Sequence, residues 1–459
     1  MSASPIAYGD ADASISAPTG ARSGSFCISL LTSTWLYAVL GLVGYASLVG
    51  SALRFCRVNR LQARYRYTDR ESLSSMTVED ASVITNHMIR YEHTLFYDLS
   101  LRLALLRTYT VKNVAKVLMS VSDLADRGQA TKRSVLPAVS PPVAVGLTDS
   151  RRRYADTSIL YTCWAQFKPQ DPLFLQSIER TNFLHAPYRK AGKILNEDLL
   201  YVLWASMAGP VRGIAMFDWR PLSDMERAAM GTLWKHIGDL MSIDYKAELG
   251  RDDWADGIDF MDDLTCWAAG YEEKYMRPYP EVRRLGEVLM ELFCDSYPKF
   301  AGPAVSSMSM VVMGERMRHA FGYPEPGLGI TALTYTLLYV RKLVVRHLIP
   351  PPLFAAPMLS MPDPKTGRMH GSAYMEHPWY VRPGFLSRWG PTAWATWLWG
   401  GVLPGDEGDR FMPEGFLFGD LGPKRTMGRG TDNDAELKRL AAVRAPTESP
   451  FKPKSKAQG

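Results

Sequence analysis

The longest uncharged stretch of the chain lies close to its N-terminus. No Asp, Glu, Lys or Arg occurs between Arg22 and Arg54, and residues 28–53 within that gap are mostly apolar. As a helix, this stretch is long enough to cross a hydrocarbon core of roughly 30 Å. A cleaved signal peptide fits poorly, because the apolar run is too long, starts too far in and has no charged segment directly before it. A buried core helix is the other alternative, but the length and the flanks of the run favour one transmembrane helix over residues 28–53.

The distribution of arginines predicts the orientation of this helix. One basic residue, Arg22, stands before the span, whereas five arginines follow it closely: Arg54, Arg57, Arg60, Arg64 and Arg66. Basic residues are retained on the cytosolic side of a membrane. We therefore expect a short N-terminus outside or in the lumen and a cytosolic body.

The composition of the chain is typical of a globular protein. The 459 residues carry a net charge of +6, and 46% of them are hydrophobic, which excludes wholesale disorder. The small positive excess is not gathered in one place, so we expect no nucleic-acid partner. Five scattered cysteines without a C-x-x-C pair argue against a disulfide framework or a zinc knuckle. Residues 1–25 and 431–459 have the polar composition of a disordered leader and a disordered tail.

From residue 76 to the three prolines at 350–352 the pattern is helical almost throughout, whereas the region from there to about residue 430 is rich in Pro, Gly and Trp and is expected to be mostly loops. No alternating run is long enough for a sheet, so the predicted class is all-α. Asp171-Pro172 predicts the start of a helix that runs through residue 185. A helix over 197–207 is expected to be capped by Asn196 and to stop at Gly209-Pro210. Ser223 with Glu226 forms a capping box for the next helix. Further helices are expected at about 253–273, 280–297 and 302–320. Residues 330–348 are apolar and then basic, which predicts a core helix or one that lies against the cytosolic face of the membrane.

The common motifs of enzymes are missing from the sequence. It contains no Walker-type loop, no G-x-G-x-x-G after a strand, no G-x-S-x-G and no H-E-x-x-H. One histidine stands in an informative place, because His185 shares a helix face with Phe174, Ile178 and Thr181. Such a histidine is usually a satisfied core residue, and ligation of haem or a metal is the alternative.

Several blocks of sequence together carry a resemblance to a known family. Residues 179–185 (ERTNFLH), 153–157 (RYADT), 107–109 (RTY), 217–220 (FDWR) and 377–381 (HPWYV) resemble the MpaB-like fungal oxygenases, which are distantly related to bacterial rubber oxygenases. The resemblance covers roughly residues 75 to 430. It implies a globin-like helical core that carries haem b, and a place in the endoplasmic reticulum membrane.

The resemblance also implies roles for individual residues. His185, with Arg180 and Arg189 around it, is similar to the proximal iron ligand, so all three are expected to bind the cofactor, Arg180 through a haem propionate. Arg153 and Thr157 match two of the three distal residues, where they would stabilise negative charge and donate a hydrogen bond. The family's lysine between them is replaced by Asp156, which would either relay protons or pair with Arg153. The family's distal glutamate has no counterpart in residues 136–145.

We therefore expect a membrane-anchored, haem-dependent oxygenase of secondary metabolism. Its substrates would be O₂ and a lipophilic isoprenoid or prenylated polyketide, attacked at a C=C bond. Two alternatives remain open. The first is a non-haem or cofactor-free acid–base enzyme, such as an isomerase or cyclase, acting on a similar substrate. The second is a non-catalytic membrane protein that binds haem or lipid.

Overall fold

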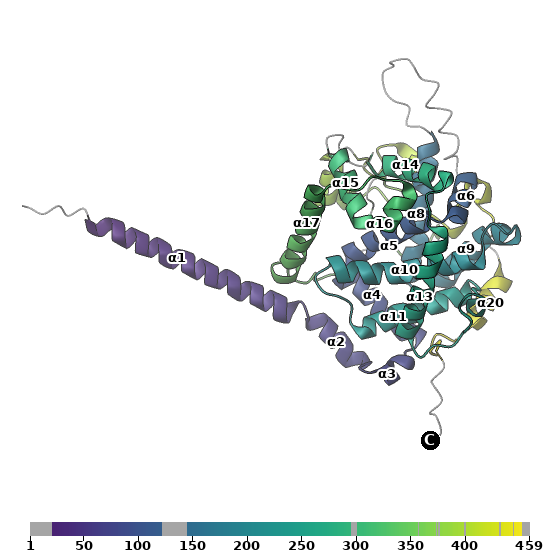
Figure 1. Ribbon diagram of the computed structural model, residues 1–459, viewed down its shortest axis with the longest axis horizontal. Coiled ribbons are helices and arrows are strands. Elements are labelled where there is room, and N and C mark those ends of the chain that lie inside the picture. Colours follow the sequence, from purple (N-terminus) through teal and green to yellow (C-terminus); the bar gives the residue numbers. More distant parts are fainter. Residues whose placement is uncertain are drawn as a thin grey trace, which may run out of the picture.

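The computed structural model describes residues 21–121, 145–294, 301–356, 358–372, 374, 377–398, 401–430, 433–443 and 445–451. A long helix projects from a rounded helical body (Figure 1). The first part of the chain contains α1 Ala21–Ser47, the π-helix η1 Leu48–Leu53, α2 Cys56–Tyr65, α3 Arg70–Ser74, α4 Val78–His87, the π-helix η2 Met88–Glu92, α5 Thr94–Thr108, α6 Lys112–Val121, α8 Val145–Gln166 and α9 Pro172–Lys190. The remainder contains α10 Asn196–Phe217, α11 Asp224–Leu240, α12 Tyr245–Leu249, α13 Gly257–Tyr275, α14 Pro280–Cys294, α15 Gly302–Met313, α16 Glu315–Phe321, α17 Leu328–His347, α18 Phe385–Trp389, α19 Pro391–Leu398 and α20 Asp434–Val443, with short 3₁₀ turns at Gly408–Phe411, Phe418–Asp420 (η5) and Lys424–Thr426.

The helical class predicted from the sequence is confirmed. In the described residues, extended pairing is limited to three isolated bridges, Val111 with Met276, Leu359 with Gly371 and Met369 with Phe416. The rest of the body is held together by helix packing around one apolar core. The domain is therefore all-α.

The predicted apolar span is a continuous helix that stands clear of the body. α1 begins at Ala21 and runs through η1 to Leu53, so residues 21–25 of the predicted leader are helical. Trp35, Tyr37 and Leu40 are exposed along it. By length and composition this helix can cross a membrane.

The centre of the body is a close contact between α5 and α10. A Cβ added at Gly209 would lie 2.5 Å from the Cβ of Ala104, and one at Gly213 would lie 2.0 Å from Oγ of Ser100. Small residues on both helices therefore let the two backbones approach closely. The predicted end of this helix at Gly209-Pro210 is wrong. The helix continues to Phe217, because burial against α5 outweighs the local cost of glycine and proline.

Two of the three predicted N-caps are confirmed, whereas Asn196, the third, is the first residue of α10 and not its cap. Asp171 accepts a hydrogen bond of 2.8 Å from the amide of Leu173, with Pro172 in the first turn of α9. Ser223 and Glu226 form the reciprocal capping box of α11. The Glu226 carboxylate also binds both terminal nitrogens of buried Arg220, at 2.7 and 2.8 Å.

Two predicted elements differ in the structure. The helix predicted over 302–320 is divided at Gly314, whose φ of +82° breaks it into α15 and α16. The C-terminal segment was predicted to be disordered, but residues 433–443 and 445–451 of it are described and pack on the body. There α20 buries Leu440 against the body, and Phe451 packs 6.3 Å from the Phe260 ring. Apolar side chains spaced through the polar segment provide enough buried surface to order it.

Candidate functional site

Arg153 and Thr157 lie one turn apart on α8 and share a face. Both side chains are half-buried. The Thr157 hydroxyl donates a hydrogen bond of 2.9 Å to the Arg153 carbonyl, so it presents lone pairs rather than a proton to a ligand. Within the described part of the chain, no hydrogen bond or ion pair engages the Arg153 guanidinium. This arginine is therefore available to an anion.

A line of hydroxyl groups continues from these two residues into the body. Tyr161, one turn after Thr157, shares a hydrogen bond of 2.9 Å with the hydroxyl of Ser206 on α10. Its ring packs against Trp164 and Trp234. Burial raises the pKa of Tyr161 to about 12, so this phenol stays neutral. The arrangement places a cation and hydroxyls beside an aromatic part of the core, which are the kinds of group that a site for a large apolar ligand combines.

Tyr109, at the end of α5, was not among the predicted site residues. Burial raises the pKa of its phenol, and the nearby positive charge of Arg153 partly opposes that rise. The two residues therefore lie close enough to interact, although they come from different helices. The sequence block RTY at 107–109, which is part of the family resemblance, could have pointed to this tyrosine. The same block holds an arginine with a structural partner. That arginine, Arg107, binds Glu272 with two hydrogen bonds of 2.6 and 2.7 Å.

Asp156 takes its hydrogen bonds and its ion pair from residues other than Arg153. Its carboxylate accepts hydrogen bonds from the Tyr380 phenol at 2.7 Å and from the Gly422 amide at 2.9 Å. Its ion pair is with Arg152, at 3.9 Å, and not with Arg153. Burial raises the pKa of Asp156 to about 6, against the lowering by Tyr380 and Arg152. Of the two roles predicted for Asp156, an ion pair with Arg153 is not formed among the described residues, although the charge of Arg153 also lowers the pKa of this carboxyl. The buried contacts fit a residue that joins α8 to Tyr380 and Gly422.

His185 lies near the end of α9, half-buried, with the buried residues Phe174, Ile178 and Thr181 behind it on the same helix face. Burial, and to a smaller extent the charge of Arg189, lowers the pKa of the imidazole to about 4. The ring is therefore neutral at neutral pH. Its nitrogens make no hydrogen bond to any described residue. A satisfied core histidine would have such a partner, whereas a ligand to a metal needs this neutral form.

Arg180 has a structural role that excludes the expected contact with a haem propionate. The side chain is fully buried, and its guanidinium donates hydrogen bonds to the carbonyl oxygens of Gly419, Leu421, Thr426 and Arg429. These partners occupy all three of its nitrogens. Arg180 thus anchors the segment that also donates the Gly422 amide to Asp156, and we correct its assignment accordingly.

Arg189 is exposed at the end of α9. It donates hydrogen bonds to the carbonyls of Met241 and Ser242, at 2.8 and 3.2 Å, and so caps the C-terminal end of α11. Its charge also acts on the imidazole of His185. Of the two arginines predicted beside His185, only this one influences it directly.

Of the residues predicted to bind the cofactor, His185 has the chemistry that haem iron needs from a protein ligand. His185 offers one neutral imidazole, which is the number of protein ligands that haem iron requires on its proximal side. Arg153 and Thr157 place a guanidinium, without a hydrogen-bond partner among the described residues, and a hydroxyl on one face of α8. Arg180 and Asp156 do not fit, because buried partners within the protein already hold them.

Comparison with known proteins finds a family whose match includes the two helices that carry the predicted site residues. Residues 128–341, which include α8 and α9, match the family described as "ER-bound oxygenase mpaB/B'/Rubber oxygenase, catalytic domain". The chain is 32% identical to the ER-bound oxygenase mpaB' of Penicillium brevicompactum, over 95% of this chain and 100% of that protein. It is 33% identical to the ER-bound oxygenase mpaB of the same fungus, over 85% of this chain and 89% of that one. The mpaB of Penicillium roqueforti is 32% identical over 63% of this chain and 90% of its own length. The chain therefore belongs to the family of ER-bound oxygenases of the mpaB and mpaB' type.

Proposed function

We propose that the protein is a membrane-anchored, haem-dependent oxygenase of fungal secondary metabolism. Its substrate would be a lipophilic isoprenoid or prenylated polyketide, oxygenated or cleaved at a C=C bond. The observation that carries the haem assignment is the neutral His185 imidazole without a hydrogen-bond partner among the described residues. The oxygenase assignment rests on the names of the relatives.

In this proposal His185 and the face of α8 have different tasks. His185 would hold the haem iron, and bound haem would supply the chemistry of O₂. Arg153 would stabilise negative charge that develops in the reaction, since its guanidinium has no described carboxylate partner. Thr157 would accept a hydrogen bond, because its own proton is directed to the Arg153 carbonyl. Tyr161 and the tryptophans around it would form part of the apolar wall.

The anchor suits a substrate of this kind. A lipophilic molecule concentrates in the bilayer, close to a body that is tethered to it. The arginines that follow the span favour a single pass with the body in the cytosol, and the names of the relatives favour the endoplasmic reticulum.

The test is an absorption spectrum of the full chain, expressed with a haem supplement and purified in nanodiscs. We expect a Soret band that disappears in His185→Ala and persists in His319→Ala, a matched change at an exposed histidine of α16. No Soret band in the unaltered chain would overturn the haem assignment. The acid–base alternative would then be favoured, with the Tyr109 and Arg153 pair as its candidate groups.

A second measurement separates an enzyme from a binding protein. Consumption of O₂ is followed while prenylated aromatic compounds are supplied in the nanodisc lipid. Uptake that depends on both the compound and His185 supports the oxygenase. A Soret band without such uptake across the panel would favour a haem-binding protein.

A further inference from the structure

Apart from the anchor, the body carries a large apolar surface at the end from which α1 projects. α17 is long and apolar enough to cross a membrane, yet little of it is buried in the body. Tyr339 is 62% exposed, and the other exposed side chains include Leu333, Leu337, Val340 and Leu343. Soluble proteins rarely expose so many large apolar groups along one helix, and such a surface marks an interaction site.

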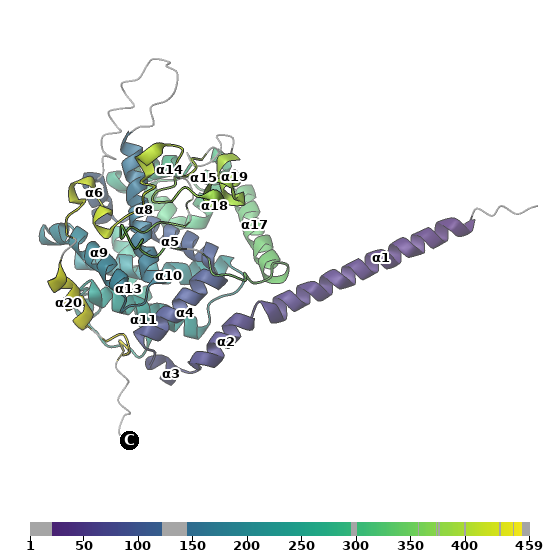
Figure 2. The ribbon, with the colours of Figure 1, turned by 180° about the vertical axis from the view of Figure 1, so that it is seen from behind.

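A second apolar group lies toward the same end of the body. Helices α18 and α19 expose Phe385, Leu386, Trp389, Trp394, Trp397 and Leu398, each by more than half. Figure 2 shows α18 and α19 beside α17, on the side of the body from which α1 projects. Tryptophan is the side chain most typical of a membrane–water interface.

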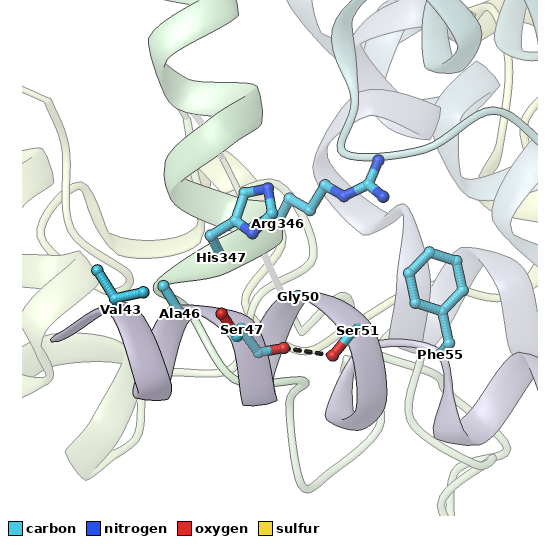
Figure 3. A pocket seen from close by; sticks show the side chains of 8 residues that line it. All are labelled: Val43, Ala46, Ser47, Gly50, Ser51, Phe55, Arg346 and His347. Atoms are coloured by element: carbon cyan, nitrogen blue, oxygen red, sulfur yellow. Dashed lines mark hydrogen bonds between the residues drawn. The ribbon is translucent and has the colours of Figure 1, made fainter. Parts of the chain in front are cut away.

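The end of the anchor is fixed to the end of α17. The Tyr45 hydroxyl donates a hydrogen bond of 3.0 Å to the Leu348 carbonyl, and Nε of Arg54 donates to the carbonyls of Val345 and Ile349, both at 3.0 Å. Figure 3 shows the His347 imidazole directly over Gly50 of η1. A Cβ at Gly50 would lie 2.3 Å from Nδ1 of that ring, so the helices touch where the span ends.

This junction determines what α17 can contact. In both ribbon views α17 stands across the direction of α1 (Figures 1 and 2). A helix that crosses the direction of a spanning helix, and whose last turn meets the end of that helix, lies along the plane of the membrane. The crevice between the two helices is about 430 Å³ and has a mostly apolar lining that includes Val43, Ala46 and Phe55.

The inner face of α17 excludes a second crossing. Thr334 is buried, and the Tyr335 ring stacks on Phe217 of α10 at 6.5 Å. Arg341 forms an ion pair of 3.3 Å with Asp218 and lies over the Phe96 ring at 4.4 Å. Insertion across the bilayer would break these contacts and carry Arg341 and Lys342 into hydrocarbon, which is costly for charged side chains.

We propose that α17, α18 and α19 form a docking face on which the body lies against the same bilayer that the anchor spans. The occupant is the lipid surface, since the face is apolar, lies at the end of the span and is flanked by Lys342, Arg346 and the arginines of α2. Basic residues beside an apolar helix face attract anionic headgroups. The inference rests on the proposed membrane placement of the anchor and not on haem.

The test uses quenching of tryptophan fluorescence by brominated lipid, with the full chain in vesicles of phosphatidylcholine and phosphatidylserine. Tyr339→Trp places a reporter on the face, and Leu195→Trp places one beside the first turn of α10. Leu195 makes a matched control because α10 separates it from α17 by roughly 30 Å of helix. Both positions are partly exposed, so neither reporter should disturb packing.

We expect the fluorescence added by Tyr339→Trp to be mostly quenched and that added by Leu195→Trp to be unaffected. Replacement of Trp389, Trp394 and Trp397 by Phe should remove quenched intensity from the unaltered chain. Equal, weak quenching of both reporters would overturn the docking face. Stronger quenching of Tyr339→Trp by bromines at the chain ends than by bromines near the headgroups would overturn it in favour of a second span.

Trp35 separates failure of the docking face from failure of the anchor. This exposed tryptophan of α1 should lie within the bilayer. Trp35→Phe should therefore remove quenched intensity whatever α17 does. If it removes none, the proposed topology fails, and the docking face fails with it.

Discussion

The phenol of Tyr380 donates a hydrogen bond of 2.7 Å to Asp156, a residue 224 positions earlier in the chain. The second oxygen of the same carboxylate accepts a hydrogen bond from the Gly422 amide, and Arg180 donates to the carbonyls of Leu421 before that glycine and Thr426 after it. The C-terminal segment is therefore fastened to α8 and α9 by two buried charged residues. Asp156 and Arg180, which the family resemblance places in the active site, therefore have structural roles in this attachment.

Asp156 should give stability a measurable pH dependence. Burial raises its pKa from 3.8 to about 6 in the folded protein, so the folded state holds this proton more tightly than the unfolded state. The contribution of the Asp156 carboxyl to the free energy of unfolding is fully present below the pKa of this group in the unfolded chain. It is lost as pH rises through the pKa of the group in the folded protein. The stability advantage of the unaltered chain over Asp156→Asn should therefore shrink by about 1–3 kcal/mol between about pH 4 and pH 7.5.

Thermal unfolding in nanodiscs across this pH range checks the prediction. Asp252→Asn is the control, because its side chain is exposed. Its difference from the unaltered chain should stay constant with pH. A gap for Asp156→Asn that widens as pH rises would contradict the assigned direction.

Arg180→Met should destabilise the whole body. It removes the donors to four backbone carbonyls and leaves them in a buried site, at a cost of about 3–5 kcal/mol. Limited proteolysis should also find new cleavage within residues 419–429. Arg189→Met serves as the control and should cost about 1 kcal/mol, since that side chain is exposed. A folded Arg180→Met chain of normal stability that had lost only haem would restore the propionate role.

Arg153→Ala should keep the Soret band but lower the turnover number by roughly 10²-fold, as expected when a group that stabilises developing charge is removed. The guanidinium has no described structural partner, so folding should be unchanged. Arg153→Lys should recover part of the rate, because it restores the charge without the planar geometry. Unchanged turnover in the alanine variant would exclude this role.

Gly209→Ala should destabilise the protein although alanine is the better helix former. The new Cβ would lie 2.5 Å from the Cβ of Ala104, and separating α5 from α10 should cost about 1–3 kcal/mol. Gly270→Ala is the matched control, because nothing lies within 4 Å of the added Cβ on α13. That change should stabilise by about 0.4–1 kcal/mol. If the two variants shifted the midpoint of thermal unfolding equally, the close approach of α5 and α10 would not matter.

Features that depend on neighbouring residues could be predicted from the sequence alone. The uncharged run predicted an apolar N-terminal helix, and the pairs Asp171-Pro172 and Ser223/Glu226 predicted the starts of α9 and α11. A cap or an apolar period acts within one or two turns, so its partners are already adjacent in the chain. His185 could be singled out in the same way, from its helix face and the blocks around it.

The use of distant residues, in contrast, depends on how the helices pack. Gly209-Pro210 is typical of a helix end. In the structure α10 continues through this pair, because Gly209 packs closely against Ser100 and Ala104 of α5. Nothing near Arg180 in the sequence shows that its partners are carbonyls about 240 residues away. Buried polar groups take whichever partner packing brings to them, because leaving them unsatisfied costs more than any local preference provides.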